Sequence, residues 1–219
     1  MSPPRALRPS GIILVDKPAG PTSFAIVAAT RRRTKARTGH AGTLDPFATG
    51  LLLLLSGAAT RLQPRFVGLP KRYSTAIDLR ARTTTGDVEG ERADEREPPD
   101  EQALVAELGG LRGAVDLPIP AASAVKIGGT RAYALHRRGV AVAMPVRTMH
   151  VHELRLDAYE EGVARLELLV SSGTYVRAIA DALGGHCASL RRTEVGPFHV
   201  DEADPDRIIE PEAALARLS

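Results

Sequence analysis

The chain has 219 residues, which corresponds to one or two domains and is long enough to bury a sizeable core. Hydrophobic residues make up 43% of it and charged residues 25%, so the composition is that of a folded protein rather than a disordered one. The longest apolar run, residues 51–55, is far shorter than the roughly 20 residues of a membrane helix, and no signal-peptide pattern precedes it. The single cysteine, Cys187, excludes an internal disulfide and a cysteine-based zinc site. We therefore expect a cytoplasmic protein.

Charges of opposite sign are segregated along the chain, although 29 Lys and Arg against 26 Asp and Glu leave a net charge of only +3. Residues 31–37, called the basic cluster below, carry five cationic side chains, whereas acids gather over residues 87–101. A basic surface suits a polyanion, because each neutralised phosphate releases counterions. A solvated helix face explains the same pattern, and charge alone favours that interpretation.

Hydrophobic periodicity and turn residues predict a chain in which strands outnumber helices. Many strands follow one another without a crossover helix, which favours antiparallel pairing. The sequence thus predicts an α+β fold, with a mixed, mostly antiparallel central sheet flanked by helices, in one domain over residues 1–219. In the first half of the chain, the expected elements are a strand over 11–17, a helix from Thr22 or Ser23 into the basic cluster, a loop over 38–50, strands over 50–56 and 71–84, and an acidic connection over 87–99. A helix over 101–108, an extended piece over 124–127 and a helix over 132–138 follow. The remaining elements are strands over 146–157 and 163–171, a helix over 175–183 and a final helix near 211–218.

Asp45 stands in the most unusual segment of the chain, TGHAGTLDPFATG over residues 38–50. Pro46 biases Asp45 towards an extended backbone, and the surrounding glycines permit a ligand to approach closely, so a carboxylate could be held at the mouth of a cleft. A structural Asp-Pro turn explains the same residues. No second acid lies nearby in sequence, so neither the acid pair of a glycosidase nor the acid cluster of a metal nuclease is evident locally.

Arg177 follows Gly173 and Thr174 and falls in the first turn of an expected helix, where the helix dipole disfavours a cation. An anion should compensate it, either a phosphate or a carboxylate such as Asp45. A cation beside Asp45 would keep that carboxylate ionised and fit to act as a nucleophile or base. A structural salt bridge is the alternative.

Tyr73, in the segment KRY, is a candidate for stacking on a nucleic-acid base, because the two cations before it could hold phosphates. The expected strand places it on the same face as Thr75, Ile77 and Leu79, so a half-buried strand tyrosine is the alternative. His40 could stack on or hydrogen-bond a nucleotide, or it could stabilise its own turn.

Five segments, in order and at similar spacing, resemble the TruB family of tRNA pseudouridine-55 synthases, and the resemblance covers nearly the whole chain. Each segment is weak alone, but the ordered set is specific. The segments are GIILVDKPAGPTS (11–23), GHAGTLDPFATGLL (39–52), KRY (71–73), SAVKIGGTRAYALHRRG (123–139) and SSGTYVRAIADALG (171–184). The resemblance implies the pseudouridine synthase fold and an isomerase that converts uridine 55 in the T-arm of tRNA to pseudouridine.

The resemblance also implies that Asp45 is the catalytic carboxylate, Arg177 its ion-pair partner and Tyr73 the aromatic residue that stacks on the target uracil. The reaction breaks the N1 glycosidic bond, turns the base and rejoins it through C5, after the base has left its stack. Asp45 would act as a nucleophile, at the ribose or at uracil C6, or first as a base that promotes elimination of uracil, and the sequence leaves these variants open. No cofactor and no metal are expected, because the reaction is redox-neutral and needs no group donor.

Further residues are expected on the RNA side of the site. His40 matches a residue that lies against flipped-out RNA, Leu190 an apolar position of the uracil pocket, and Lys17 the lysine of the KP turn, where a structural role is expected over a catalytic one. The residues expected to bind the substrate or RNA are His40, Lys17, Arg72 and Leu190. The expected partner is tRNA, bound by a monomer that needs neither a membrane nor a protein partner.

Departures from the family pattern leave alternatives open. Ala122 stands where the family usually has an aromatic residue and Thr84 where an Asp is common, and both could weaken substrate contacts. Bacterial members usually carry a small C-terminal RNA-binding domain, whereas barely one helix follows Phe198, so we expect a catalytic domain alone. The alternatives are a synthase for another RNA, a silent RNA-binding or tRNA-folding protein, and a nucleoside hydrolase or RNA glycosidase that releases free uracil.

Overall fold

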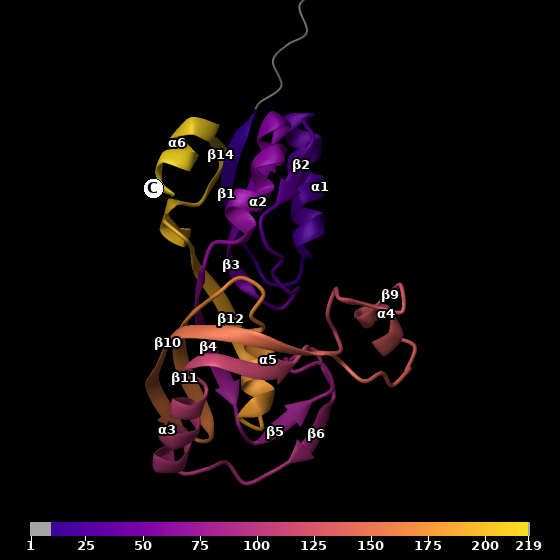
Figure 1. Ribbon diagram of the computed structural model, residues 1–219, viewed down its shortest axis with the longest axis vertical. Helices are drawn as coiled ribbons and strands as arrows, with labels where there is room; N and C mark the ends of the chain where they lie inside the picture. Colours follow the sequence, from indigo (N-terminus) through magenta and orange to yellow (C-terminus); the bar gives the residue numbers. More distant parts are fainter. Residues whose placement is uncertain (1–9, 219) are drawn as a thin grey trace, which may run out of the picture. The chain divides into compact units, whose positions relative to one another are not determined.

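The computed structural model describes residues 10–218, which form two compact units (Figure 1). Unit 1 comprises residues 10–73 and 191–218 of the described chain, and unit 2 comprises Ser74–Leu190. The chain crosses between the units within strands β4 (Lys71–Asp78) and β12 (His186–Val195). The single domain over residues 1–219 stays a prediction.

Unit 1 is built around strand β3, whose apolar residues 51–55 are all fully buried. β3 pairs antiparallel with β1 and β2 and parallel with the last part of β12, and β14 pairs antiparallel with the other edge of β1. Alternate β3 side chains pack into a core that includes Phe66 and Phe198, whose ring centroids are 5.9 Å apart. The strands are β1 (Gly11–Lys17), β2 (Thr38–His40), β3 (Thr49–Ser56), β13 (Phe198–His199) and β14 (Asp204–Ile209).

The helices of unit 1 cover this sheet. Helix α1 begins after Thr22, whose hydroxyl accepts a hydrogen bond from the Ala25 amide, and it packs against β2 and β3. Its last turn carries part of the basic cluster, which the helix dipole favours. The helices are α1 (Ser23–Thr34), the 3-10 helix η1 (Gly57–Leu62), α2 (Gln63–Val67), the 3-10 helix η2 (Val200–Glu202) and α6 (Pro211–Ala216), which packs against β1.

Unit 2 has the strand order β4-β11-β10-β7. Alternation explains its core, because Ala164, Leu166, Leu168 and Val170 of β11 are buried on one face. Helix α3 packs against β10 and α5 against β7, and the Asp100 side chain caps α3 by accepting from the Ala103 amide. The elements are β5 (Ala81–Thr83), β6 (Arg92–Glu95), α3 (Glu101–Gly110), β7 (Gly113–Pro118), β8 (Lys126–Ile127), β9 (Thr130–Arg131), α4 (Ala132–His136), β10 (Val146–Glu160), β11 (Val163–Val170) and α5 (Val176–Ala182).

The predicted α+β class with a mixed, mostly antiparallel sheet is confirmed, but several local predictions were wrong. The expected loop over 38–50 contains β2 and the start of β3. The expected strand over 71–84 is two strands, because the Asp78 carboxylate accepts from the Arg80 amide and turns the chain there. Strand β12 was missed because its polar sequence HCASLRRTEV hides an alternating buried face. Strands β6, β7 and β14 were also missed, because they are mostly exposed and show no regular apolar alternation.

Gly50 is a position where only glycine fits. Its φ is +101°, and a Cβ atom would lie 2.2 Å from the carbonyl oxygen of Arg192 on β12. We expect Gly50→Ala to lower the free energy of unfolding by about 2–4 kcal/mol, because it adds a backbone clash to a left-handed conformation. Urea unfolding would measure this, with Gly39→Ala as control, because a Cβ there meets nothing within 4 Å. Equal stability of the two variants would contradict the expectation.

Candidate active site

Asp45 lies half-buried in the loop of residues 41–48 that joins β2 to β3. The carbonyl of Asp45 accepts from the Ala48 amide at 3.2 Å, and the carbonyl of Pro46 accepts from the Gly20 amide at 2.9 Å. The turn after β1 and the loop of Asp45 are therefore joined through their backbones.

The two chain neighbours of Asp45 are anchored by side chains. The Ser23 hydroxyl donates to the carbonyl of Leu44 and accepts from the Leu44 amide, both at 2.8 Å. The Lys17 ammonium donates to the carbonyls of Pro46, Pro18 and Pro21 at 3.1, 2.8 and 2.9 Å. Lys17 is fully buried, so the structure places it beneath the loop rather than at the surface. Asp45 is thus held on a fixed backbone.

Two more cations lie beneath the same loop. The Arg192 guanidinium donates to the carbonyls of Gly42, Thr43 and Leu51, and the Lys71 ammonium donates to the carbonyls of Val67 and Leu69 at 2.6 and 2.5 Å. Burial, and secondarily the charge of Arg192, lower the pKa of Lys71 to about 8. Burial and Arg192 also lower the pKa of His40, which favours the neutral imidazole. The sequence analysis expected Lys71 to hold a phosphate beside Tyr73, and this was wrong, because its ammonium is buried and donates to backbone carbonyls. The buried position of Arg192 was not predicted.

The buried Lys71 predicts a pH dependence of stability. A lysine in the unfolded chain keeps its proton up to about pH 10.5, whereas the folded protein releases it near pH 8. Between these values the unfolded state binds more protons, so the free energy of unfolding gains up to about 1.4 kcal/mol per pH unit from this group as pH rises. Urea unfolding between pH 7.5 and 9.5 should show that the free energy of unfolding of wild type rises relative to that of Lys71→Met. Parallel curves would contradict the expectation.

Tyr73 and Arg72 are neighbours on β4. Tyr73 is buried, with 8% of its surface exposed, while Arg72 is half-buried and its Nε lies 3.2 Å from a Glu194 carboxylate oxygen on β12. Tyr73 therefore lies inward, as predicted. Its stacking on uracil and the phosphate contact of Arg72 stay predictions.

In unit 2, Arg177 is 3% exposed in the first turn of α5. Its Nη1 donates to the carbonyl of Thr85 at 2.7 Å, and its Nη2 donates to the carbonyl of Ala122 at 3.0 Å. Its Nη1 also lies 3.6 Å from the carboxylate of Asp87. A buried ion pair therefore supplies an anion for the cation in this helix turn.

Asp87 is a buried partner of Arg177 that the sequence analysis missed, because it was placed in a polar, acidic connection. Its carboxylate is buried and accepts from the Thr85 hydroxyl at 2.6 Å and the Glu89 amide at 3.0 Å. The signal that could have found it was the need of Arg177 for an anion, which was assigned only to Asp45 or a phosphate. The pairing of Asp45 with Arg177, which would join the two units, stays a prediction.

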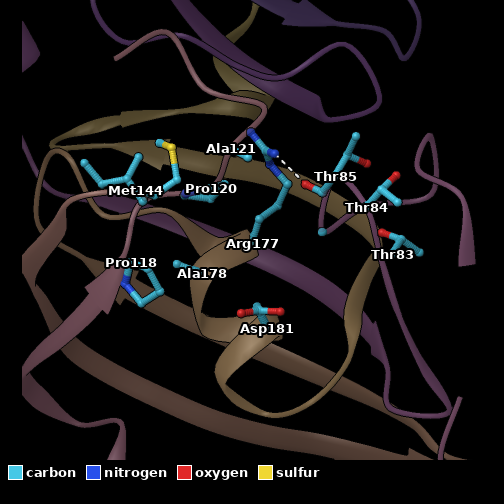
Figure 2. A pocket seen from close by; sticks show the side chains of 12 residues that line it. Thr83, Thr84, Thr85, Pro118, Pro120, Ala121, Met144, Arg177, Ala178 and Asp181 are labelled. Carbon is cyan, nitrogen blue, oxygen red and sulfur yellow. Dashed lines mark hydrogen bonds between the residues drawn. The ribbon is translucent and has the colours of Figure 1, made fainter. Parts of the chain in front are cut away.

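A pocket of about 180 Å³ lies beside Arg177 within unit 2. Figure 2 shows the side chain of Arg177 with the threonines of one wall on one side and Met144 with the prolines of the other wall on the opposite side. Thr84, which replaces the Asp common in the family pattern, is part of the first wall. Leu190, also in unit 2, is nearly buried on β12. The lining residues are Thr83, Thr84, Thr85, Gly86, Pro118, Ile119, Pro120, Ala121, Met144, Arg177, Ala178 and Asp181.

The described residues offer no cluster of metal ligands. Over residues 10–218, no three His, Cys, Asp or Glu side chains are placed to hold a metal ion. The independence of the reaction from metal and cofactor stays a prediction. In the same part of the chain, no helix has both the length and the apolar character needed to cross a membrane.

Solved structures share this fold. A chain in the crystal structure of a Cbf5-Nop10-Gar1 complex matches with a TM-score of 0.68 and 27% identity, over 88% of this chain and 50% of that one. The archaeal box H/ACA sRNP Nop10-Cbf5 complex gives a TM-score of 0.63 and 26% identity, with the same coverage. The chain thus spans about half the length of these structures and has the pseudouridine synthase fold.

Sequence comparison gives the family. The model for the N-terminal domain of TruB family pseudouridylate synthases matches residues 30–176. The "tRNA pseudouridine synthase B" of Leifsonia xyli subsp. xyli is 44% identical over 94% of this chain and 74% of its own length. That of Thermobifida fusca is 43% identical over 88% of this chain and 72% of its own length. The chain belongs to the TruB family of pseudouridylate synthases, which are isomerases.

Proposed function

We propose that the protein is a tRNA pseudouridine synthase that isomerises uridine 55 in the T-arm. The observation that carries the proposal is the loop of Asp45, where Ser23 and Lys17 anchor the residues on both sides of a half-buried carboxylate. The relatives named "tRNA pseudouridine synthase B" support tRNA as the substrate class. A tRNA substrate in turn supports a cytoplasmic location.

In this proposal Asp45 supplies the reactive carboxylate. The target uridine leaves its stack, and the buried ring of Tyr73 offers a face on which the uracil stacks. Asp45 then attacks the ribose or uracil C6 as a nucleophile, or first acts as a base in the elimination of uracil, and the N1–C1′ bond breaks. The turned base forms the C5–C1′ bond, and C5 releases its proton to solvent. Arg177 holds Asp45 ionised, and Leu190 gives the pocket an apolar wall that retains the free base.

Basic residues outside the site support binding of RNA phosphates. In unit 1 the exposed cations of the basic cluster lie in the last turn of α1 and just after it. In unit 2 the segment of β8, β9 and α4 exposes four cations, and the guanidinium of Arg137 lies 5.6 Å from the centre of the Tyr133 ring. Each phosphate contact adds affinity and salt dependence. The four cations are Lys126, Arg131, Arg137 and Arg138.

Release of tritium from C5 tests this function, because the new glycosidic bond replaces the C5–H bond of uracil. Unmodified tRNA transcript labelled at uridine C5 should release one tritium equivalent per molecule, and a matched transcript with cytidine at position 55 should release none. Release from both transcripts would indicate that another uridine of the tRNA is the target. Tight binding without release would favour a silent RNA-binding protein. Free uracil in the product would identify a glycosidase.

A further inference from the structure

Arg192 is the most completely buried cation after Lys17, with 1% of its surface exposed. Its Nε donates to the carbonyl of Leu51 at 2.7 Å, its Nη2 to Gly42 at 3.1 Å and its Nη1 to Thr43 at 3.4 Å. Arg191, its neighbour in sequence, instead pairs with Asp16 at a half-exposed position. No carboxylate forms an ion pair with Arg192 in the part of the chain that the structure describes.

This arrangement is costly for the fold. Transfer of a charge out of water is unfavourable unless polar groups compensate it, and here carbonyl dipoles do so without a counter-ion. The ammonium of Lys71 increases the cost, because the charge of Arg192 contributes to the lowered pKa of Lys71. Burial of an apolar residue at the same strand position would cost less free energy. Stability alone therefore does not explain the contacts of the guanidinium.

The contacts lead to the loop of Asp45. β12 runs parallel to β3 with Arg192 opposite Gly50, so the backbone of Arg192 is fixed in the sheet. The guanidinium of Arg192 donates to Leu51 of β3 and also to Gly42 and Thr43 of the loop. It therefore joins the strand to the loop. At Gly42, where φ is +103°, an added Cβ would lie 3.6 Å from the Arg192 Nη1. The loop therefore follows the guanidinium closely.

We propose that Arg192 is a positioning residue for the reaction, which fixes the first half of the loop and so sets where the Asp45 carboxylate is presented. The inference rests on the proposed function of Asp45. Ser23 and Lys17 hold Leu44 and Pro46, next to Asp45. Arg192 holds the part of the loop before them, at Gly42 and Thr43. A lysine cannot replace the guanidinium, because it lacks the planar fork that reaches three carbonyls at once.

The test compares Arg192→Lys and Arg192→Gln with wild type. We expect the single-turnover rate of pseudouridine formation to fall about 100-fold, the effect of a misplacement near 1 Å, while the Kd for tRNA changes by less than about threefold. Hydrogen exchange of amides over residues 41–48 should accelerate, and that of β1 amides should not. The matched control is Arg217→Lys, because Arg217 also donates to a backbone carbonyl, that of Pro197 at 2.6 Å.

A single-turnover rate within about twofold of wild type in Arg192→Lys would overturn the proposal, and so would equal losses of rate and affinity. If the Arg192 variants do not fold, Gly42→Ala displaces the same carbonyl from the loop side. The same split between rate and affinity is then expected, and an unchanged rate overturns the proposal. If wild type forms no pseudouridine, the proposed function fails. Unchanged hydrogen exchange over residues 41–48 in the Arg192 variants is a separate result, which contradicts the anchoring of the loop by Arg192.

Discussion

Asp45→Asn should abolish pseudouridine formation, with a rate loss of about 10⁴-fold or more, while the affinity for tRNA changes by less than about threefold. The amide has the size of the carboxylate, and the backbone on both sides of Asp45 is held by Ser23 and Lys17, so the loop keeps its conformation. Only the negative charge and the nucleophilic oxygen are lost. Single-turnover kinetics and equilibrium binding to tRNA measure the two quantities separately.

The control for this variant is Asp16→Asn, also in unit 1. The Asp16 carboxylate is half-exposed and pairs with Arg191, and such surface pairs contribute little free energy. We expect its rate to stay within about twofold of wild type. If Asp45→Asn lost affinity and rate together, Asp45 would have a structural role instead.

Arg177→Met should lose both stability and activity. It leaves the Asp87 carboxylate buried without its cation and removes the donors to Thr85 and Ala122, so we expect the free energy of unfolding to fall by about 3–5 kcal/mol. We expect the rate to fall by about 100-fold or more, because Asp45 loses the proposed cation. Urea unfolding and single-turnover kinetics measure the two effects.

Two further variants separate the roles of Arg177. Arg82→Met breaks an exposed pair with Asp181 in the same unit and should cost less than about 1 kcal/mol. Adding Asp87→Asn to Arg177→Met should recover part of the stability but none of the rate, since the two buried partners interact with each other. A wild-type rate in Arg177→Met would remove the proposed pairing with Asp45.

The sequence predicted best those features that local chemistry determines. Thr22 and Asp100 cap helices as expected, and the alternation of β4 places Tyr73 and Thr75 inward. The predicted fold class is confirmed, and the short apolar run of residues 51–55, bounded by turn residues, forms the buried strand that it predicted.

The contacts that hold the site could not be predicted, because they join residues far apart in the chain. Lys17 meets Pro46, Arg192 meets Gly42, and Arg177 meets Asp87 only once the strands are aligned. A buried lysine or arginine carries no local signal, since its charge is typical of a surface residue. Strand β12 could not be predicted for a similar reason. Its polar residues give no signal for the strand or for the register that places Arg192 beside Gly50.

The most direct test is nucleotide-resolution chemical mapping of pseudouridine in unmodified tRNA transcript, after incubation with wild type and with Asp45→Asn in EDTA. We predict one modified nucleotide, position 55 in the T-loop, with wild type and none with the variant. Modification at position 55 by Asp45→Asn, or its absence with wild type, would contradict it.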